Sequence, residues 1–177
     1  MATSGPGTLI GVAVAIPEPL ASQVTGWRTR FGDPQSTQIA AHITLVPPML
    51  VTDLLVVEQH LEEVASRSPA FTIHLRGTGT FRPLAPVVFL ALTEGISGCD
   101  ALQRRLRSGP LDLDLTYPYH PHVTVAHHLS DEVLDEAFDS LADFEATFLA
   151  DRFDFYEQDA DGAWFTRKSF LLADQRR

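Results

Sequence analysis

The sequence is poor in cysteine and has no long apolar run. Cys99 is the single cysteine, so the chain cannot form an intrachain disulfide. No apolar stretch approaches the roughly 20 residues that a membrane-spanning helix requires. The opening residues, MATSGPGTL, lack the basic start and the apolar core of a signal peptide. We therefore expect a cytoplasmic protein that does not bind a membrane.

Positive charge is also scarce. Lys168 is the one lysine, and 23 acidic residues against 13 lysines and arginines give a formal net charge of −10. Affinity for nucleic acid comes mainly from lysines and arginines that displace counterions, so this balance excludes a long nucleic-acid footprint. The expected partner is a small nucleotide or an RNA end that carries a phosphodiester, and we expect the chain to be a monomer.

The apolar content of 45% over 177 residues is enough for a hydrophobic core, and we expect one domain over 1–177, frayed at 1–7 and 173–177. Apolar patterns predict strands over 8–16, 39–46, 71–75, 87–93, 120–129, 146–156 and 163–172, and helices over 19–32, 53–66, 97–107 and 131–144. Pro47 and Pro48 are expected to end the second strand. Gly77 to Gly79 predicts a bulge or turn, and the last two strands predict a hairpin.

Two similar tetrapeptides, HITL at 42–45 and HVTV at 122–125, stand 80 positions apart (122 − 42). The apolar strands that precede them start 79 apart (87 − 8), and the same order of strand, helix, HxT strand and helix follows in each half. This pattern indicates an internal duplication. Two α+β units would pair about a pseudo-two-fold axis and place His42 and His122 across one cleft.

Alternation along a strand sends the histidine and threonine of each motif to one face and the apolar pair to the other. Two imidazoles near their reference pKa of about 6.5 can act together at neutral pH, one as a base and one as an acid. In-line attack on a phosphodiester uses such a pair, and the hydroxyls of Thr44 and Thr124 can donate hydrogen bonds to the phosphate oxygens. This scheme requires no metal and no cofactor.

The two HxT motifs at this spacing resemble those of the 2H phosphoesterase superfamily, and the phrases HITLVPPML, GTGTFRP, PVVFLAL and PYHPHVTVAHH resemble its bacterial 2′-5′ RNA ligase family. The resemblance implies a bilobal α+β fold, in which two antiparallel sheets form a central cleft with helices on the outside. It further implies metal-independent hydrolysis of 2′,3′-cyclic phosphates of nucleotides or RNA ends, with an RNA ligase-like activity also possible for the family.

Carried over by residue, the resemblance makes His42 the proton donor, His122 the proton acceptor, and Thr44 and Thr124 the phosphate ligands. Aromatic side chains often hold the base in this family, and the candidates for base or substrate contacts are Phe81, Tyr119, Trp164 and His128. Many relatives carry an arginine soon after the second motif, where this chain has His127 and His128.

Two alternatives remain open at the level of sequence. His42, His120 and His122 could instead ligate a metal, with His127 or His128 completing the set. The chain could also be a non-catalytic module that binds a nucleotide or an RNA end and leaves it intact. His60 and His74 have no partner motif and are interpreted as structural.

Overall fold

The structure is a computed structural model that describes residues 7–174. Its strands form two four-stranded antiparallel sheets, with the orders β2-β1-β7-β8 and β5-β4-β3-β6. The strands are β1 (Thr8–Ala15), β2 (His42–Val51), β3 (Phe71–Thr80), β4 (Val87–Glu94), β5 (His122–His127), β6 (Glu145–Ala150), β7 (Arg152–Gln158) and β8 (Trp164–Leu171). The helices are α1 (Leu20–Phe31), α2 (Leu54–Ser66), α3 (Ile96–Leu106) and α4 (Asp131–Ser140), with 3-10 turns η1 (Pro34–Thr37) and η2 (Gly109–Leu111). The predicted α+β fold with two antiparallel sheets is confirmed.

The duplication extends to a shared irregularity in the two HxT strands. β2 pairs with β1, and β5 pairs with β4, in the same antiparallel way, and in each pair the residue directly after the threonine is bulged: Leu45 and Val125. A bulge adds one residue to a strand, so two successive residues turn inward before the alternation resumes. The equivalent positions after the bulge are Pro47 and His127 (47 + 80).

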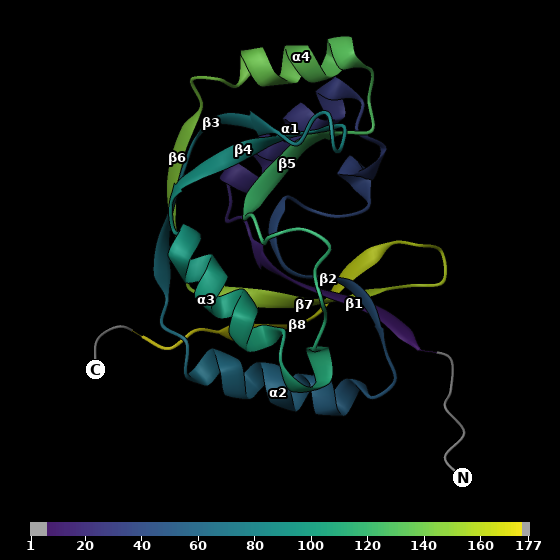
Figure 1. Cartoon of the computed structure of the whole chain (residues 1–177), viewed down its shortest axis with the longest axis vertical. Coiled ribbons are helices and arrows are strands. Elements are labelled where there is room, and N and C mark those ends of the chain that lie inside the picture. Colours follow the sequence, from purple (N-terminus) through teal and green to yellow (C-terminus); the bar gives the residue numbers. More distant parts are fainter. Residues whose placement is uncertain (1–6, 175–177) are drawn as a thin grey trace.

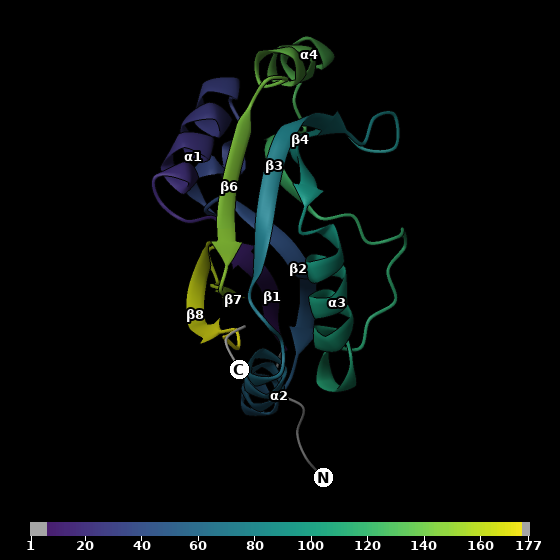
Figure 2. The ribbon, with the colours of Figure 1, turned by 90° about the vertical axis from the view of Figure 1, so that its left-hand side faces the viewer.

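Each sheet is covered by one helix from each half of the chain. α1 packs against β5 and α4 covers β3, β4 and β5, whereas α3 packs against β2 and α2 contacts β8. Figures 1 and 2 show α1 and α4 at the upper end and α2 and α3 at the lower end. Trp27 of α1 meets Phe144, just after α4, with ring centroids 5.0 Å apart. α1 and α3 therefore cross to the sheet that carries the other half's HxT strand.

The core is continuous across both sheets. Ile43, Leu45, Val123 and Val125 are fully buried within the same hydrophobic cluster, so the inner face of both HxT strands is fixed by hydrophobic burial. No helix in the described part of the chain is both long and apolar enough to cross a membrane.

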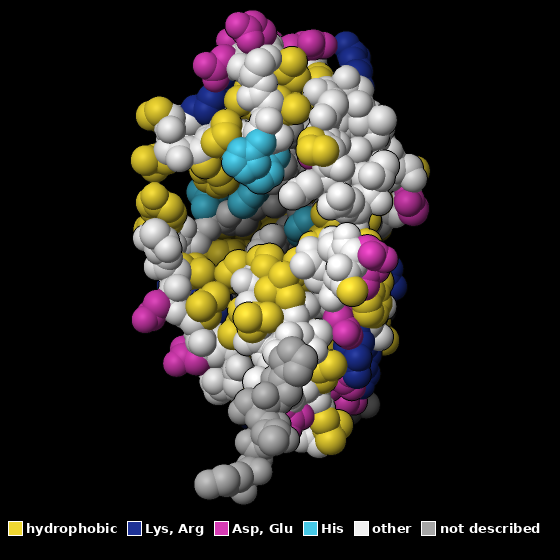
Figure 3. All heavy atoms as spheres, turned by 90° about the vertical axis from the view of Figure 1, so that its right-hand side faces the viewer, with side chains coloured by type: hydrophobic (Ala, Val, Ile, Leu, Met, Phe, Trp, Pro, Cys, Tyr) yellow, Lys and Arg dark blue, Asp and Glu magenta, His cyan; other side chains and the backbone are white. Residues whose placement is uncertain are grey.

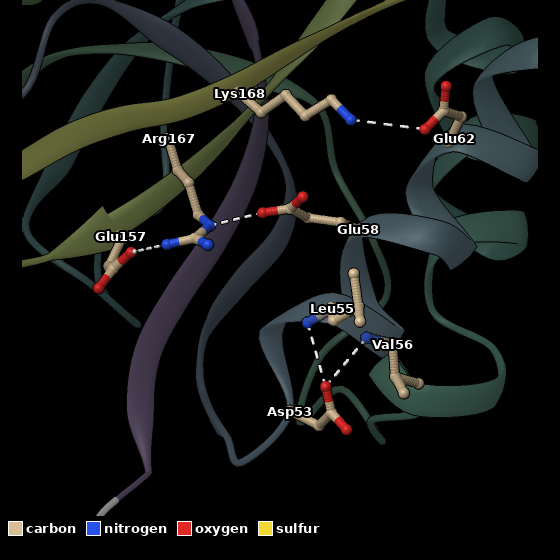
Figure 4. Close-up of polar contacts among 8 residues, drawn as sticks. All are labelled: Asp53, Leu55, Val56, Glu58, Glu62, Glu157, Arg167 and Lys168. Atoms are coloured by element: carbon tan, nitrogen blue, oxygen red, sulfur yellow. Dashed lines mark hydrogen bonds and ion pairs between the residues drawn. The ribbon is translucent and has the colours of Figure 1, made fainter.

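Polar contacts attach α2 to β8, an edge strand of the first sheet (Figure 4). The Asp53 carboxylate accepts hydrogen bonds from the backbone of the first helical turn, which caps the start of α2. Arg167 of β8 pairs with Glu58 of α2 at 2.6 Å and with Glu157 of β7 at 3.0 Å. Beside it, Lys168 reaches Glu62 at 3.4 Å. These solvent-facing pairs add to the hydrophobic contact of α2 rather than replace it.

Several predicted boundaries were wrong. β2 continues through Pro47 and Pro48 to Val51, because it is an edge strand whose outer side needs no hydrogen-bond donors. The segment predicted as one strand over 146–156 is divided at Asp151: β6 pairs with β3 in the second sheet, and β7 pairs with β1 in the first. The predicted last hairpin is formed by β7 and β8, without β6.

Other boundaries moved by a few residues. β5 covers only 122–127, and α4 ends at Ser140 rather than 144. The segment from Gly77 to Gly79 lies inside a longer β3 that is bulged there, which is one of the two predicted possibilities. Most of the ends predicted to fray, 1–6 and 175–177, lie outside the described residues, but Ala173 pairs with Pro69 and is therefore held in place.

Candidate active site

Both HxT motifs lie at the start of their strands, and within each motif the histidine and threonine side chains point to the same face of the strand. In β2 and in β5 the histidine and threonine are half-buried, whereas the residues between and after them are fully buried. The alternation predicted from the sequence is thus present in both motifs, and each leaves one imidazole and one hydroxyl on the outer face.

The two histidines are held by the same hydrogen bond. Nδ1 of His42 lies 2.8 Å from the carbonyl oxygen of Ala40, and Nδ1 of His122 lies 2.7 Å from that of His120. A carbonyl can only accept, so each Nδ1 carries the hydrogen. Nε2 of each neutral ring is therefore left with a lone pair, and it is the atom available to take or give a proton.

Two cavities meet at Thr44. The larger, about 470 Å³, adjoins His122, and the smaller, about 180 Å³, adjoins His42, while Thr44 lines both. β2 and β5 also contact each other directly. Figure 3 shows histidine side chains gathered in the hollow between the upper and lower parts of the molecule, with hydrophobic side chains beneath them. His122 and His42 therefore face two adjoining cavities that share Thr44, and these two cavities together are called the cleft. Thr124 is half-buried on the outer face of β5 and lines neither of these two cavities.

Burial lowers the pKa of both histidines. For His42 the positive charge of Arg28 lowers the pKa further, partly offset by the bond to Ala40. For His122 the bond to His120 likewise opposes burial, and the nearby histidines, His42 among them, lower the pKa. Both imidazoles are consequently neutral at pH 7 in the free protein.

Arg28 is a buried side chain that sequence reasoning missed. It lies on α1, forms an ion pair with Asp33 at 3.0 Å, and donates from Nη1 to the carbonyl of Ile39 at 2.8 Å. Both side chains of the pair are nearly inaccessible to solvent. The Ile39 carbonyl immediately precedes Ala40, whose own carbonyl holds His42, so Arg28 fixes the backbone that orients this imidazole.

The predicted aromatic contacts divide between the two cavities. Phe81 and Tyr119 line the larger one, and Trp164 lines the smaller one. Phe81 meets the His122 ring edge-on, with centroids 4.9 Å apart. The Tyr119 hydroxyl donates to the Thr44 carbonyl at 2.8 Å, so only its ring faces the cavity.

Further lining residues were not predicted. Tyr156 lies in the smaller cavity with its ring centroid 6.4 Å from that of His42, and Gln35 lies there too. Tyr117 and Leu84 line the larger cavity. The alternating pattern around Tyr156 was a usable signal for β7, but the sequence does not indicate that β7 joins the sheet of His42.

The family model described as the 2′-5′ RNA ligase superfamily matches residues 16–162. The chain belongs to this superfamily. A Bacillus pumilus protein named "Putative phosphoesterase" is 30% identical over 171 residues, covering 93% of this chain and 98% of that protein. A Bacillus thuringiensis protein of the same name is 27% identical over 167 residues, covering 92% and 96%. The family that the two HxT motifs resemble is thus confirmed.

Solved structures show the same fold. Escherichia coli LigT in its apo form has a TM-score of 0.66 at 22% identity, with 96% of this chain and 99% of that chain covered. LigT complexed with 3′-AMP has a TM-score of 0.65 at 22% identity, with 95% and 99% covered. TT0787 of Thermus thermophilus has a TM-score of 0.57 at 19% identity, with 95% and 100% covered.

In this member of the 2′-5′ RNA ligase superfamily, His127 and His128 lie at the end of β5 and just beyond it. Their rings stack with centroids 3.8 Å apart, and His128 adopts a positive φ of 54°. Burial and the charge of His128 lower the pKa of His127. His128, predicted as a substrate contact, is exposed and lines neither cavity of the cleft.

The histidines of this superfamily member are not gathered into a set of three potential metal ligands in the described part of the chain. Among residues 7–174, no three His, Cys, Asp or Glu side chains are grouped so that they could hold an ion. His120 instead packs against Phe81 and Phe89. The structural histidines are elsewhere: His60 bonds to the Leu106 carbonyl, and His74 pairs with Glu145. The set His42, His120 and His122 is therefore better described as two cleft imidazoles and one wall residue.

A glycine in β3 makes room for the aromatic support of His122. A Cβ atom at Gly79 would lie 2.5 Å from the Phe89 ring, whose centroid is 5.2 Å from that of His122. We expect Gly79→Ala to lower the free energy of unfolding by about 1–3 kcal/mol, because it overpacks this contact. Urea denaturation measures the change.

The matched control is Gly26→Ala on α1, where nothing lies within 4 Å of the added atom. This substitution should stabilise the protein by about 0.5–1 kcal/mol, since glycine is unfavourable inside a helix. Equal effects of the two substitutions would contradict the packing explanation for Gly79.

Proposed function

We propose that this chain is a phosphoesterase that opens the 2′,3′-cyclic phosphates of nucleotides or RNA ends, by acid–base catalysis between two histidines and without a required metal. The observation that carries the proposal is the repeated site: two imidazoles with the same Nδ1–carbonyl bond facing one cleft. The relatives named as phosphoesterases support this class of reaction. The 3′-AMP complex of LigT, a protein of the same fold, is consistent with a nucleotide in the cleft.

In the proposed reaction, water attacks phosphorus and a bond between phosphorus and a ribose oxygen breaks. His122 takes the proton of the water on Nε2, and His42 gives a proton from Nε2 to the departing ribose oxygen, with the roles that the family resemblance implies. The product carries a phosphomonoester on one of the 2′ and 3′ oxygens and a newly freed hydroxyl on the other. The Thr44 hydroxyl, which lines both cavities, donates a hydrogen bond to a non-bridging oxygen, where negative charge develops. Thr124 is given the same role by the family resemblance and by its place beside His122 on the outer face of β5.

The nucleoside is assigned to the larger cavity. Its volume of about 470 Å³ is in the range of small-ligand pockets, and its wall is mostly apolar and aromatic, with Phe81 and the Tyr119 ring among the lining residues. A flat base can pack against such rings. Trp164 lies in the smaller cavity, about 180 Å³, on the side of His42.

The pH dependence follows from the lowered pKa of both histidines. The kcat/KM profile reports groups of the free enzyme, and one imidazole must be neutral while the other is protonated. Because both free-state pKa values lie below the usual value of about 6.5, we expect the maximum of kcat/KM below that pH. The bound anion favours the protonated ring, so the maximum of kcat should lie at higher pH.

Initial rates from pH 5 to 9 at saturating and at limiting substrate measure both profiles. A kcat/KM maximum well above about pH 7 would mean that the pKa values of the two histidines are not lowered as their burial indicates. His74→Ala serves as the control, because His74 lies outside the cleft and its loss should leave both profiles in place.

The decisive assay incubates the protein with adenosine 2′,3′-cyclic phosphate in EDTA and separates the products by chromatography. Conversion to adenosine 2′- or 3′-monophosphate supports the proposal. Binding of the cyclic phosphate without any product after overnight incubation would instead identify a non-catalytic nucleotide-binding module. Activity that disappears in EDTA and returns with a divalent ion would show that a metal is required.

A further inference from the structure

The walls of the cleft carry no fixed positive charge. Among the described residues, neither a lysine nor an arginine lines the larger or the smaller cavity. The larger cavity is enclosed by the loop that carries Phe81 and Leu84 and by the segment from Leu115 to His120. The ionisable residues that line the cleft are His42, His120 and His122 together with three tyrosines, Tyr117, Tyr119 and Tyr156.

Two arginines close in sequence or in space to residues of the cleft, Arg28 and Arg82, are occupied by other partners. Arg28 is buried between Asp33 and the Ile39 carbonyl. Arg82, directly after Phe81, pairs with Asp131 at 3.5 Å and with Asp135 at 2.9 Å. Two carboxylates face this one guanidinium, so the cluster as a whole is negative.

Arg107 lies behind the wall formed by the segment from Leu115 to His120, and its guanidinium is likewise engaged by other groups of the protein. It donates to the Gln103 side chain and to the Leu113 carbonyl, and so anchors the start of the segment that forms the wall. Asp112 and Asp114, on that segment, are exposed to solvent. With a net charge of −10, the protein offers a second phosphate group no cation at the cleft and an unfavourable field around it.

We propose that the cleft selects substrates whose only negative charge is the reacting phosphodiester: a nucleoside 2′,3′-cyclic phosphate with a free 5′-hydroxyl is preferred over a 5′-phosphorylated one or an RNA end. This inference rests on the proposed function and narrows its substrate class. The single charge of the diester is met by the imidazoles and threonine hydroxyls, whereas an additional phosphate finds no lysine or arginine among the residues that line the two cavities. Binding of a nucleic-acid chain gains affinity chiefly from such cationic contacts.

The test compares adenosine 2′,3′-cyclic phosphate with the same compound carrying a 5′-phosphate, and with a short oligonucleotide that ends in a 2′,3′-cyclic phosphate. At low ionic strength kcat/KM should be higher for the first substrate by about tenfold or more. Added salt should reduce this difference, because it screens the repulsion. Equal kcat/KM values, or a preference for the oligonucleotide, would overturn the inference.

Binding separates this inference from the proposed function. Calorimetric titration of His122→Ala protein with the two cyclic phosphates compares their affinities without turnover. A weaker affinity for the 5′-phosphorylated compound supports charge selection even where no product forms in the assay. Equal affinity overturns charge selection, whatever the activity.

Engineered charge provides a second, independent test. The Leu84 and Tyr117 side chains line the larger cavity and are 77% and 64% exposed, so an arginine at either site can reach a second phosphate without entering the core. Leu84→Arg and Tyr117→Arg should each lower the ratio of kcat/KM between the two cyclic phosphates by at least about threefold.

Leu171→Arg is the matched control. Leu171 is 72% exposed at the end of β8 and lines neither cavity, so it adds the same charge to the molecule at a distance from the cleft. For this variant, the ratio of kcat/KM between the two cyclic phosphates should remain that of the unmodified protein. A ratio that changes equally in all three variants, or in none, would contradict local charge selection at the larger cavity.

Discussion

We expect His42→Ala and His122→Ala each to lower kcat/KM for adenosine 2′,3′-cyclic phosphate by about 10²- to 10⁴-fold, the usual contribution of general acid–base catalysis. Each substitution removes one Nε2 that faces the cleft and leaves the buried face of its strand unchanged. Steady-state kinetics measure the loss, and circular dichroism checks the fold. His74→Ala is the matched control: His74 on β3 pairs with Glu145 on the edge strand β6, and this variant should retain near-normal activity.

The double variant distinguishes a joint mechanism from two separate effects. Groups that act in one transition state are not additive, so His42→Ala/His122→Ala should lose little more than either single variant. Losses that multiply would indicate that the histidines contribute independently. Either single variant with wild-type kcat would contradict the two-histidine mechanism.

A substrate with a stable leaving anion assigns the two roles. A p-nitrophenyl phosphodiester needs no proton on its departing oxygen, so the variant that lacks the acid should lose much less activity on it than on the cyclic phosphate. With His42 as the donor, His42→Ala is the variant that recovers. Recovery of His122→Ala instead would exchange the two roles.

Arg28→Met is expected to lower the free energy of unfolding by about 3–5 kcal/mol, because it leaves the buried carboxylate of Asp33 without its partner. Such a loss is a large share of the roughly 5–15 kcal/mol that stabilises a domain. Chemical denaturation measures it. Arg30→Met, on the same helix, breaks only an exposed pair with Glu136 and should cost at most about 1 kcal/mol.

The same substitution has a kinetic readout. The Arg28 charge lowers the pKa of His42, so its removal should raise that pKa and move one limb of the kcat/KM profile to higher pH. If Arg28→Met protein remains as stable as Arg30→Met protein, the pair is not important for the fold. An unshifted pH profile would show that Arg28 does not act on His42.

The sequence predicted those features of the site that repeat along the chain. HITL and HVTV were recognisable because identical side chains recur at one spacing, and the alternation of polar and apolar residues gave the direction of His42 and Thr44. The boundaries of β2 were wrong because the effect of Pro47 depends on the strand being at an edge, and sheet position is not a local property.

Pairing between distant segments was not predictable in the same way. The residues around Asp151 have a continuous strand-like pattern, yet the chain changes sheets there, because β6 and β7 pair with strands far away in sequence. Arg28 was missed for a related reason. An arginine on an amphipathic helix is usually exposed, and only the fold shows that this one is buried against Asp33 and the backbone that orients His42.

The exchange of α1 and α3 between the sheets has a consequence for how the cleft works. Each half of the chain supplies a helix that packs against the other half's HxT strand, so neither half has a complete core by itself. We expect the two lobes to unfold in one cooperative transition. The separation of His42 and His122 is then set by a shared core rather than by a hinge, and the two imidazoles hold their positions before any substrate arrives, as preorganised catalysis requires.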